Sequence, residues 1–213
     1  MNLRSLALAL GLTAIAAPAH ANFHLWEVTE IFSNDDGTVQ FVEFYTEDIG
    51  QEVLAGHALE TYQQNVMRKQ FTVPTSIPVP QGESTADRHF LVATPGFLAV
   101  AGIAPDFEMP VGFLEPGIID EVALVGADAM DFAAGALPTD GVNSLNDPGG
   151  GDPVFPAAAT PTNFARQVGT IPEPDVGFAG AVALACVASL RRRVSVARVA
   201  GRLDGGSMRS RRW

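Results

Sequence analysis

Residues 23–46, FHLWEVTEIFSNDDGTVQFVEFYT, decide the fold. The two runs on either side of Asn34-Asp35-Asp36-Gly37 are rich in β-branched and aromatic residues, and they alternate in part between apolar and polar. A cluster of Asn, Asp and Gly between two such runs is a turn signal. The stretch therefore predicts a β-hairpin over residues 24–46.

Further strand-like segments follow at intervals, at residues 54–62, 89–94 and 121–125. Glycine and proline punctuate them, and Pro74, Pro78 and Pro80 predict an extended loop between the first two. Short strands separated in this way are typical of a β-sandwich or a small barrel. Residues 96–104 and 128–134 are expected to form at most a turn or two of helix. The predicted class is all-β.

This region resembles the lamin-tail-like domain, an immunoglobulin-type β-sandwich of many secreted bacterial proteins. The matching phrases, in the family's order, are VTEIFSNDDGTVQFVEFYT, VLAGHALETY, FTVPTSIPVPQG, HFLVAT, IIDEVALVG, NSLN and ATPTN. The resemblance implies an immunoglobulin-like β-sandwich over residues 22–165. Residues 95–117 depart from the family and are expected to form a long loop. The Gly- and Pro-rich residues 137–175 predict a domain edge that continues into a flexible stalk over 166–175.

Charge divides the chain into two parts. The 213 residues carry a net charge of −11, but residues 22–172 hold 21 acidic and 4 basic residues, whereas residues 173–213 hold 3 acidic residues and 8 arginines. An acidic middle of this kind excludes nucleic acid as a partner, because nucleic-acid binding requires Lys and Arg to neutralise phosphates. The one cysteine, Cys186, excludes an intrachain disulfide and a multi-cysteine metal site.

The first 21 residues have the layout of a secretory signal peptide. Arg4 precedes an apolar stretch over residues 6–17, Pro18 follows, and Ala19 and Ala21 occupy the −3 and −1 positions of a cleavage site. The alternative is a buried N-terminal helix. A signal peptide predicts export through the Sec machinery.

The other end carries a three-part pattern. Pro172-Glu173-Pro174 precedes an uncharged run over residues 176–190, and Arg191, Arg192 and Arg193 follow at once. The run and its arginines, residues 176–193, predict a short transmembrane helix with the arginines on the cytoplasmic side. An ordinary single-pass anchor would have the same pattern.

The three parts together resemble the PEP-CTERM sorting signal of Gram-negative bacteria. The resemblance implies an exosortase-type processing peptidase as a partner, an inner-membrane-anchored precursor, and delivery to the cell surface or the extracellular polysaccharide. The family usually ends soon after its arginines, whereas this chain continues with the basic residues 194–213. That tail is either a cytoplasmic extension or a misassigned end of the reading frame.

No catalytic motif stands out in the sequence. His24, His57 and His89 form no close-spaced ligand pair, and there is no nucleophile elbow and no phosphate-binding glycine loop. Among the acids, Glu27, Glu30 and Glu43 fall close together in the predicted hairpin. A pair of them could do glycosidic acid–base chemistry, although chance alone would produce such pairs in so acidic a domain.

Calcium is the one metal that the sequence suggests. Asn34, Asp35 and Asp36 offer hard oxygen ligands at a tight turn, although the turn lacks the closing glutamate of an EF-hand loop. The alternative is a plain solvated hairpin turn, where the same residues are favoured for their backbone conformations.

The leading hypothesis is an exported, non-catalytic protein of the cell envelope or matrix, which acts through structure or binding. Its partners would be polysaccharide or neighbouring surface proteins, and Trp26, Tyr45 or Tyr62 could line a groove if they are not core residues. One alternative is a secreted, carboxylate-dependent glycan hydrolase. The other is a permanently anchored membrane protein with a periplasmic domain.

Overall fold

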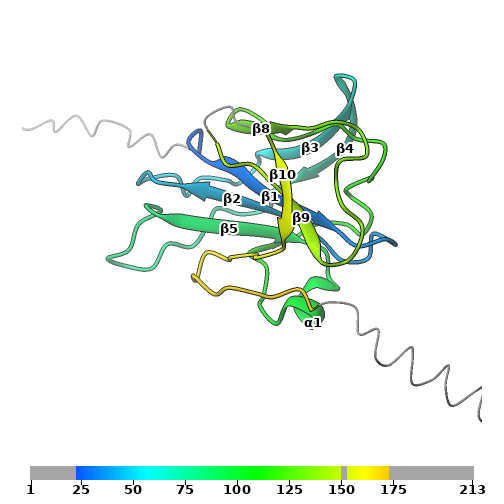
Figure 1. The fold of residues 1–213 in the computed structure, drawn as a ribbon. Helices are drawn as coiled ribbons and strands as arrows, with labels where there is room; N and C mark the ends of the chain where they lie inside the picture. Colours follow the sequence, from blue (N-terminus) through cyan, green and yellow to red (C-terminus); the bar gives the residue numbers. More distant parts are fainter. Residues whose placement is uncertain (1–22, 150–152, 173–213) are drawn as a thin grey trace, which may run out of the picture. The chain divides into compact units, whose positions relative to one another are not determined.

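A computed structural model of the chain describes residues 23–149 and 153–172. Over these residues the protein is all-β, with ten strands and one short helix (Figure 1). The strands are β1 (Glu27–Ser33), β2 (Gln40–Thr46), β3 (Ala58–Gln63), β4 (Val66–Thr72), β5 (Arg88–Ala93), β6 (Phe107–Glu108), β7 (Glu121–Leu124), β8 (Asp128–Asp131), β9 (Asn143–Asn146) and β10 (Phe155–Ala158); the helix is α1 (Phe97–Ala101).

The strands form two sheets. The larger has the order β10-β9-β1-β2-β5-β6, and the smaller has the order β4-β3-β7-β8. All pairs are antiparallel except β5 with β6, which is parallel. The prediction of an all-β fold with two packed sheets is therefore confirmed.

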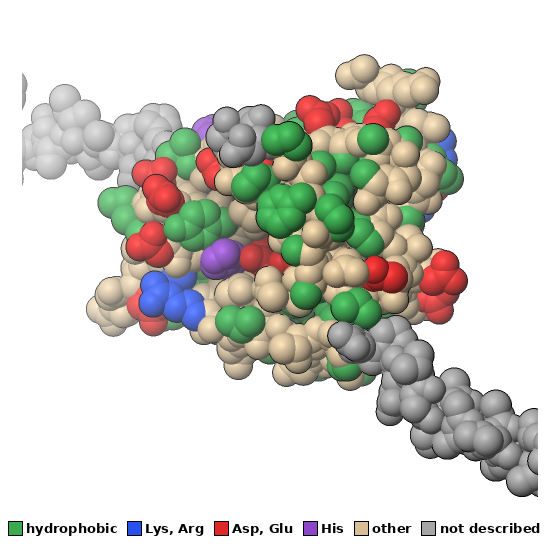
Figure 2. All heavy atoms as spheres, viewed as in Figure 1, with side chains coloured by type: hydrophobic (Ala, Val, Ile, Leu, Met, Phe, Trp, Pro, Cys, Tyr) green, Lys and Arg blue, Asp and Glu red, His purple; other side chains and the backbone are tan. Residues whose placement is uncertain are grey.

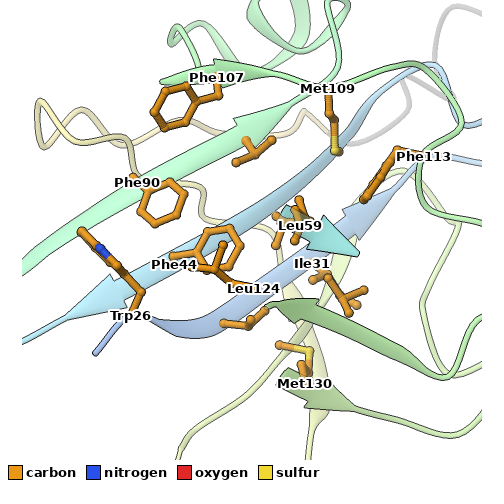
Figure 3. Packing of buried hydrophobic residues seen from close by; sticks show 14 of the residues in the cluster. Trp26, Ile31, Phe44, Leu59, Phe90, Phe107, Met109, Phe113, Leu124 and Met130 are labelled. Carbon is orange, nitrogen blue, oxygen red and sulfur yellow. The ribbon is translucent and has the colours of Figure 1, made fainter. Parts of the chain in front are cut away.

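The main core lies between the two sheets (Figure 3). Ile31, Phe44 and Phe90 from the larger sheet meet Leu59 and Leu124 from the smaller one, and all five are 0–1% exposed. Aromatic rings dominate the contacts: Phe44 stacks on Phe90 with ring centroids 4.3 Å apart, and Trp26 meets Phe90 edge-on at 4.7 Å. Burial of these side chains on facing surfaces is the main force that holds the sheets together.

A second core covers the opposite face of the larger sheet. Phe32, Phe41 and Leu91 project from β1, β2 and β5 on that side, and α1 and the segment after β10 pack over them. Phe41 stacks on Phe32 at 5.4 Å between ring centroids and meets Phe97 of α1 edge-on at 5.6 Å. Because β2 and β5 are covered on both faces, nearly all of their residues are buried.

The hairpin predicted over residues 24–46 is present as β1 and β2. Its alternation is only partial because β1 contains a bulge: Val28 pairs with Phe44 and Glu30 pairs with Glu43, so Thr29 is the extra residue. The bulge lets Val28 and Ile31 both face the inner core, although they are three residues apart. It also turns Glu30 to the outer face.

Two features of the smaller sheet differ from the sequence prediction. Residues 66–72 form β4, which pairs with β3 through a two-residue turn in which Gln64 and Asn65 both have positive φ, 51° and 62°. This is the geometry of tight hairpins, but it is reached here without the usual glycine. Residues 128–131 form strand β8 rather than a helical turn, because Met130 alone is buried between exposed neighbours, as in a strand with one covered face.

The insert over residues 95–117, expected to be a long loop, contributes buried side chains to both cores. It contains α1 and β6, places Phe97 and Ile103 on the outer face, and places Phe107, Met109 and Phe113 in the inner core. The insert therefore wraps around one edge of the larger sheet.

More of the glycine- and proline-rich C-terminal stretch belongs to the folded unit than the sequence predicts. Residues 143–146 and 155–158 are strands β9 and β10. In the segment that follows, Ala159 and Ile171 pack against the outer face, and Phe164 joins the inner core. Gly169 donates its amide to the Pro161 carbonyl, and Thr170 donates to the Ala101 carbonyl. The compact unit thus reaches Ile171, beyond the boundary placed at residue 165 and into the stretch expected to be a stalk.

Candidate functional site

Two buried glutamates and a half-buried histidine meet on the outer face of the larger sheet. Glu30 on β1 and Glu43 on β2 are directly opposite each other across the strand pair, and their exposed fractions are 3% and 4%. His89 on β5 contacts Glu43, with Nδ1 and Oε1 2.6 Å apart. We call Glu30, Glu43 and His89 the outer acid cluster.

The outer acid cluster fastens the chain that covers it. We call residues 159–171 the strap; Figure 1 shows this gold segment leaving β10 and ending beside α1. The Thr160 amide donates to Glu30 Oε1 at 3.0 Å, and the Thr162 amide donates to Glu43 Oε2 at 2.6 Å. Two residues further on, the Phe164 amide donates to Asp106 Oδ2 at 2.9 Å. Alternate amides of an extended segment point the same way, so three carboxylates bind one side of the strap.

Burial changes the protonation of these acids. It raises the pKa of Glu30 to about 7, and the nearby charge of Glu43 adds to the rise, while hydrogen bonds from Ser144 and Thr160 oppose it. Burial also raises the pKa of Asp106 against the opposing amides of Phe164 and Leu91. Near neutral pH the Glu30 carboxyl is therefore shared between its charged and neutral forms.

A pair of carboxyls with one raised pKa is the equipment of an acid–base hydrolase. In this structure, however, both carboxyls accept strap amides and are almost wholly buried. The strap therefore covers both carboxyls and takes up an oxygen of each. In the outer acid cluster, the two glutamates serve as hydrogen-bond acceptors that hold the strap on the sheet.

The hairpin turn uses its own polar side chains. Asn34 Oδ1 accepts the Val39 amide at 3.0 Å, and Asp36 Oδ1 accepts the Thr38 amide at 3.0 Å and the Thr38 hydroxyl at 2.6 Å. These hydrogen bonds lower the pKa of Asp36. Asp35 is exposed. Across the described ranges, 23–149 and 153–172, no three His, Cys, Asp or Glu side chains are grouped as a metal site would require.

The aromatic residues considered as groove candidates have different surroundings. Trp26 is wholly buried in the inner core. Tyr45 and Tyr62 are half-buried, and each hydroxyl hydrogen bonds to an acid, Asp87 at 3.2 Å and Glu60 respectively. The bond to Glu60 raises the pKa of Tyr62 to about 12.

An acidic hollow of about 350 Å³ lies at the N-terminal end of β1. Its lining includes Glu27, Glu47, Asp48 and Asp128. Burial and the charges of Asp128 and Glu47 raise the pKa of Glu27. Glu27, which the sequence grouped with Glu30 and Glu43, therefore belongs to a different surface.

The remaining predicted residues lie at the end of the described ranges or outside them. Pro172 is exposed and is the last described residue of the C-terminal range. The other residues of the sorting and cleavage motifs, with the predicted transmembrane helix, lie outside the described residues; they are Ala19, Ala21, Glu173, Pro174, Arg191, Arg192 and Arg193. Within the part of the chain that is described, no helix has the length and apolar character needed to cross a membrane.

Comparison of the chain with protein-family models, with curated proteins and with solved structures found no match.

Proposed function

We propose that the protein is an exported, non-catalytic component of the cell surface or extracellular matrix, sorted by its PEP-CTERM-like tail. The observation that carries this proposal is the place where the folded unit ends. The strap is held as far as Ile171, and the three-part tail begins with the next residue, Pro172. A peptidase that cuts near Pro174 would release the sandwich with its strap complete.

The fastening role of the outer acid cluster supports a non-catalytic protein. An acid–base pair must reach the bond that it cleaves, whereas Glu30 and Glu43 hold backbone amides under a cover. We propose further that the sandwich is of the immunoglobulin type, as the lamin-tail-like resemblance implies. It would present its loops and strand edges to polysaccharide or neighbouring surface proteins.

The test is the C-terminal sequence and location of the protein recovered from its own cells and medium. We expect an intact mass that corresponds to a start at Asn22 and an end near Pro174, in the surface or released fraction. Glu173→Ala should abolish this processing, while Val168→Ala, an exposed strap residue, should leave it unchanged.

Recovery of a chain that still carries Arg191–Arg193, in the inner membrane, would contradict the proposal and favour a permanent anchor. Turnover of a polysaccharide by the purified protein, lost in Glu30→Gln or Glu43→Gln, would instead favour the hydrolase.

A further inference from the structure

A second pocket lies at the edge of the strap, away from the acidic hollow. It has a volume of about 710 Å³, and its walls come from the proline-rich crossover, the start of β5, the segment before β6 and the strap. We call it the arginine pocket; it is lined by Pro78, Pro80, Glu83, Arg88, Asp106, Phe164, Ala165 and Arg166. Its volume is within the range of small-molecule sites, ~300–1,000 Å³.

The arginine pocket concentrates the scarce positive charge of the domain. Residues 22–172 contain only four basic residues, and Arg88 and Arg166 are two of them. Figure 2 shows the same contrast, since acidic side chains are scattered over this face whereas Lys and Arg side chains are confined to small patches. Pro78, Pro80, Phe164 and Ala165 also line the pocket, so it offers apolar as well as charged contacts.

Arg88 is fixed in place but only partly paired. It is 8% exposed, Nη1 donates to the Phe164 carbonyl at 2.9 Å, and its guanidinium lies 5.1 Å from the centroid of the Phe164 ring. Nη2 pairs with one oxygen of Glu83, whereas the buried Nε has no hydrogen-bond partner. A carboxylate that binds arginine through two parallel bonds would use Nε and Nη2 together.

The two acids of the pocket are not equivalent. Asp106 Oδ2 is taken by the amides of Leu91 and Phe164, so Asp106 is part of the framework. The Glu83 side chain is 44% exposed, and one of its oxygens pairs with Nη2 of Arg88. Glu83 can therefore turn away into solvent when another carboxylate takes its place, because the buried Arg88 then keeps a negative partner.

We propose that the arginine pocket binds a small cyclic monocarboxylate. In the free protein, the Glu83 side chain occupies the position that the ligand's carboxylate takes in the complex. The ligand carboxylate displaces Glu83 and takes both Nε and Nη2 of Arg88, with Arg166 as the second cation. Its body lies against Pro78, Pro80 and Phe164. A single negative charge fits best, because Asp106 remains nearby and the domain as a whole is acidic.

The test measures the binding of small carboxylates to the full-length protein by saturation-transfer NMR and by calorimetry. The probes are cyclohexanecarboxylate, its neutral isostere cyclohexanecarboxamide, and D-glucuronate. We expect at least one carboxylate to bind with a Kd on the order of 1 mM, as suits so small a ligand, and the amide not to bind. Tighter binding of cyclohexanecarboxylate would indicate that the natural ligand has an apolar ring, and tighter binding of D-glucuronate would indicate a sugar acid.

Variants locate the site. Glu83→Gln removes the competing carboxylate and should tighten binding about fivefold, while Arg166→Gln should weaken it about threefold. The matched controls are Arg68→Gln and Glu115→Gln, which break the ion pair at 3.3 Å beside β4 and should change nothing.

Failure of both carboxylates to bind wild type and Glu83→Gln at about 20 mM, some twentyfold above the expected Kd, would overturn the proposal. Equal binding of the amide, or weaker binding by Glu83→Gln, would also overturn it. The proposal is independent of the sorting pathway, so neither result bears on the tail.

Discussion

The two faces of β2 are covered by different kinds of structure. Its inner face presents Val42 and Phe44 to a second sheet among apolar side chains, while Gln40 at the start of the strand hydrogen bonds to Ser33 and to the backbone of Leu114. Its outer face presents Phe41 beside the carboxyl of Glu43, under a cover made of one short helix and the strap. One seven-residue strand thus takes part in a mainly apolar core between two sheets on one side and in an acid-bearing core on the other.

The difference shows what each cover requires. A sheet satisfies its own backbone groups, so its partner face can be purely apolar. The strap is a single extended segment, and its amides at residues 160, 162 and 164 need acceptors that no neighbouring strand provides. Glu30, Glu43 and Asp106 supply those acceptors. Buried acids are the consequence of covering a sheet with an isolated strand-like segment.

Truncating one phenylalanine on each face of β2 tests the comparison most strongly. Both Phe44 and Phe41 are fully buried, and replacing either by alanine should lower the free energy of unfolding by about 3–5 kcal/mol. We expect Phe44→Ala to cost more, because two sheets cannot close around the cavity, whereas α1 and the strap can shift inward. Urea denaturation of both variants measures this, and an equal or larger cost for Phe41→Ala would mean that the outer cover is as rigid as a sheet.

Burial of Glu30 makes the outer face contribute to the pH dependence of stability. The pKa of Glu30 is about 7 in the folded protein against 4.5 ordinarily, so the folded state holds this proton more tightly. Its contribution to stability is therefore complete below pH 4.5 and is lost as the pH rises through about 7. The loss is on the order of 3 kcal/mol.

Glu30→Gln is the variant that isolates this effect. The variant carries no charge at any pH, so its stability relative to wild type should rise between pH 5 and pH 8 and then level off. Unfolding free energies at a series of pH values give the curve. Glu108→Gln, an exposed acid on β6, is the control and should follow wild type. A flat difference for Glu30→Gln would show that Glu30 is ionised throughout.

Removal of Glu43 should loosen the strap. Glu43→Ala leaves the Thr162 amide and His89 without their acceptor, but it also relieves the repulsion on Glu30. We expect a net loss of about 2 kcal/mol. Hydrogen exchange followed by mass spectrometry should show faster exchange over residues 159–171, with β7 and β8 unaffected. Unchanged protection of the strap would mean that its apolar contacts alone hold it.

The sequence predicts the part of the fold that depends on local pattern. The hairpin follows from alternation and the strand at β5 follows from a continuous apolar run, and both are present. Of the two stretches expected to form at most a turn or two of helix, residues 96–104 contain α1 and residues 128–134 contain strand β8. β4 escaped prediction because its turn uses Gln64 and Asn65 at positive φ rather than glycine. The residues of β4 are mostly exposed, so its apolar pattern is also weak.

The candidate site could be predicted only in part. That two of the glutamates could face each other across strands follows from the hairpin, and Glu30 and Glu43 do pair in register. The cover does not follow, because the strap lies 130 residues from Glu30 and meets it through a backbone amide that any residue except proline possesses. No side-chain signal marks such a contact. Only the structure shows that the outer face of β2 is covered, since six of its seven residues are buried.

The hairpin turn offers the smallest and most specific test. If Asn34, Asp35 and Asp36 bound calcium, the melting temperature would rise with calcium and fall with chelator. We expect no shift, because Asn34 Oδ1 and Asp36 Oδ1 already accept amides within the turn, and a cation would have to compete with those bonds. Asp36→Asn is the matched variant, since it keeps an oxygen for Thr38 but removes the charge. A calcium-dependent shift in wild type that Asp36→Asn abolishes would establish a metal site. It would also show that the acids of this domain serve cations at its loops as well as amides beneath the strap.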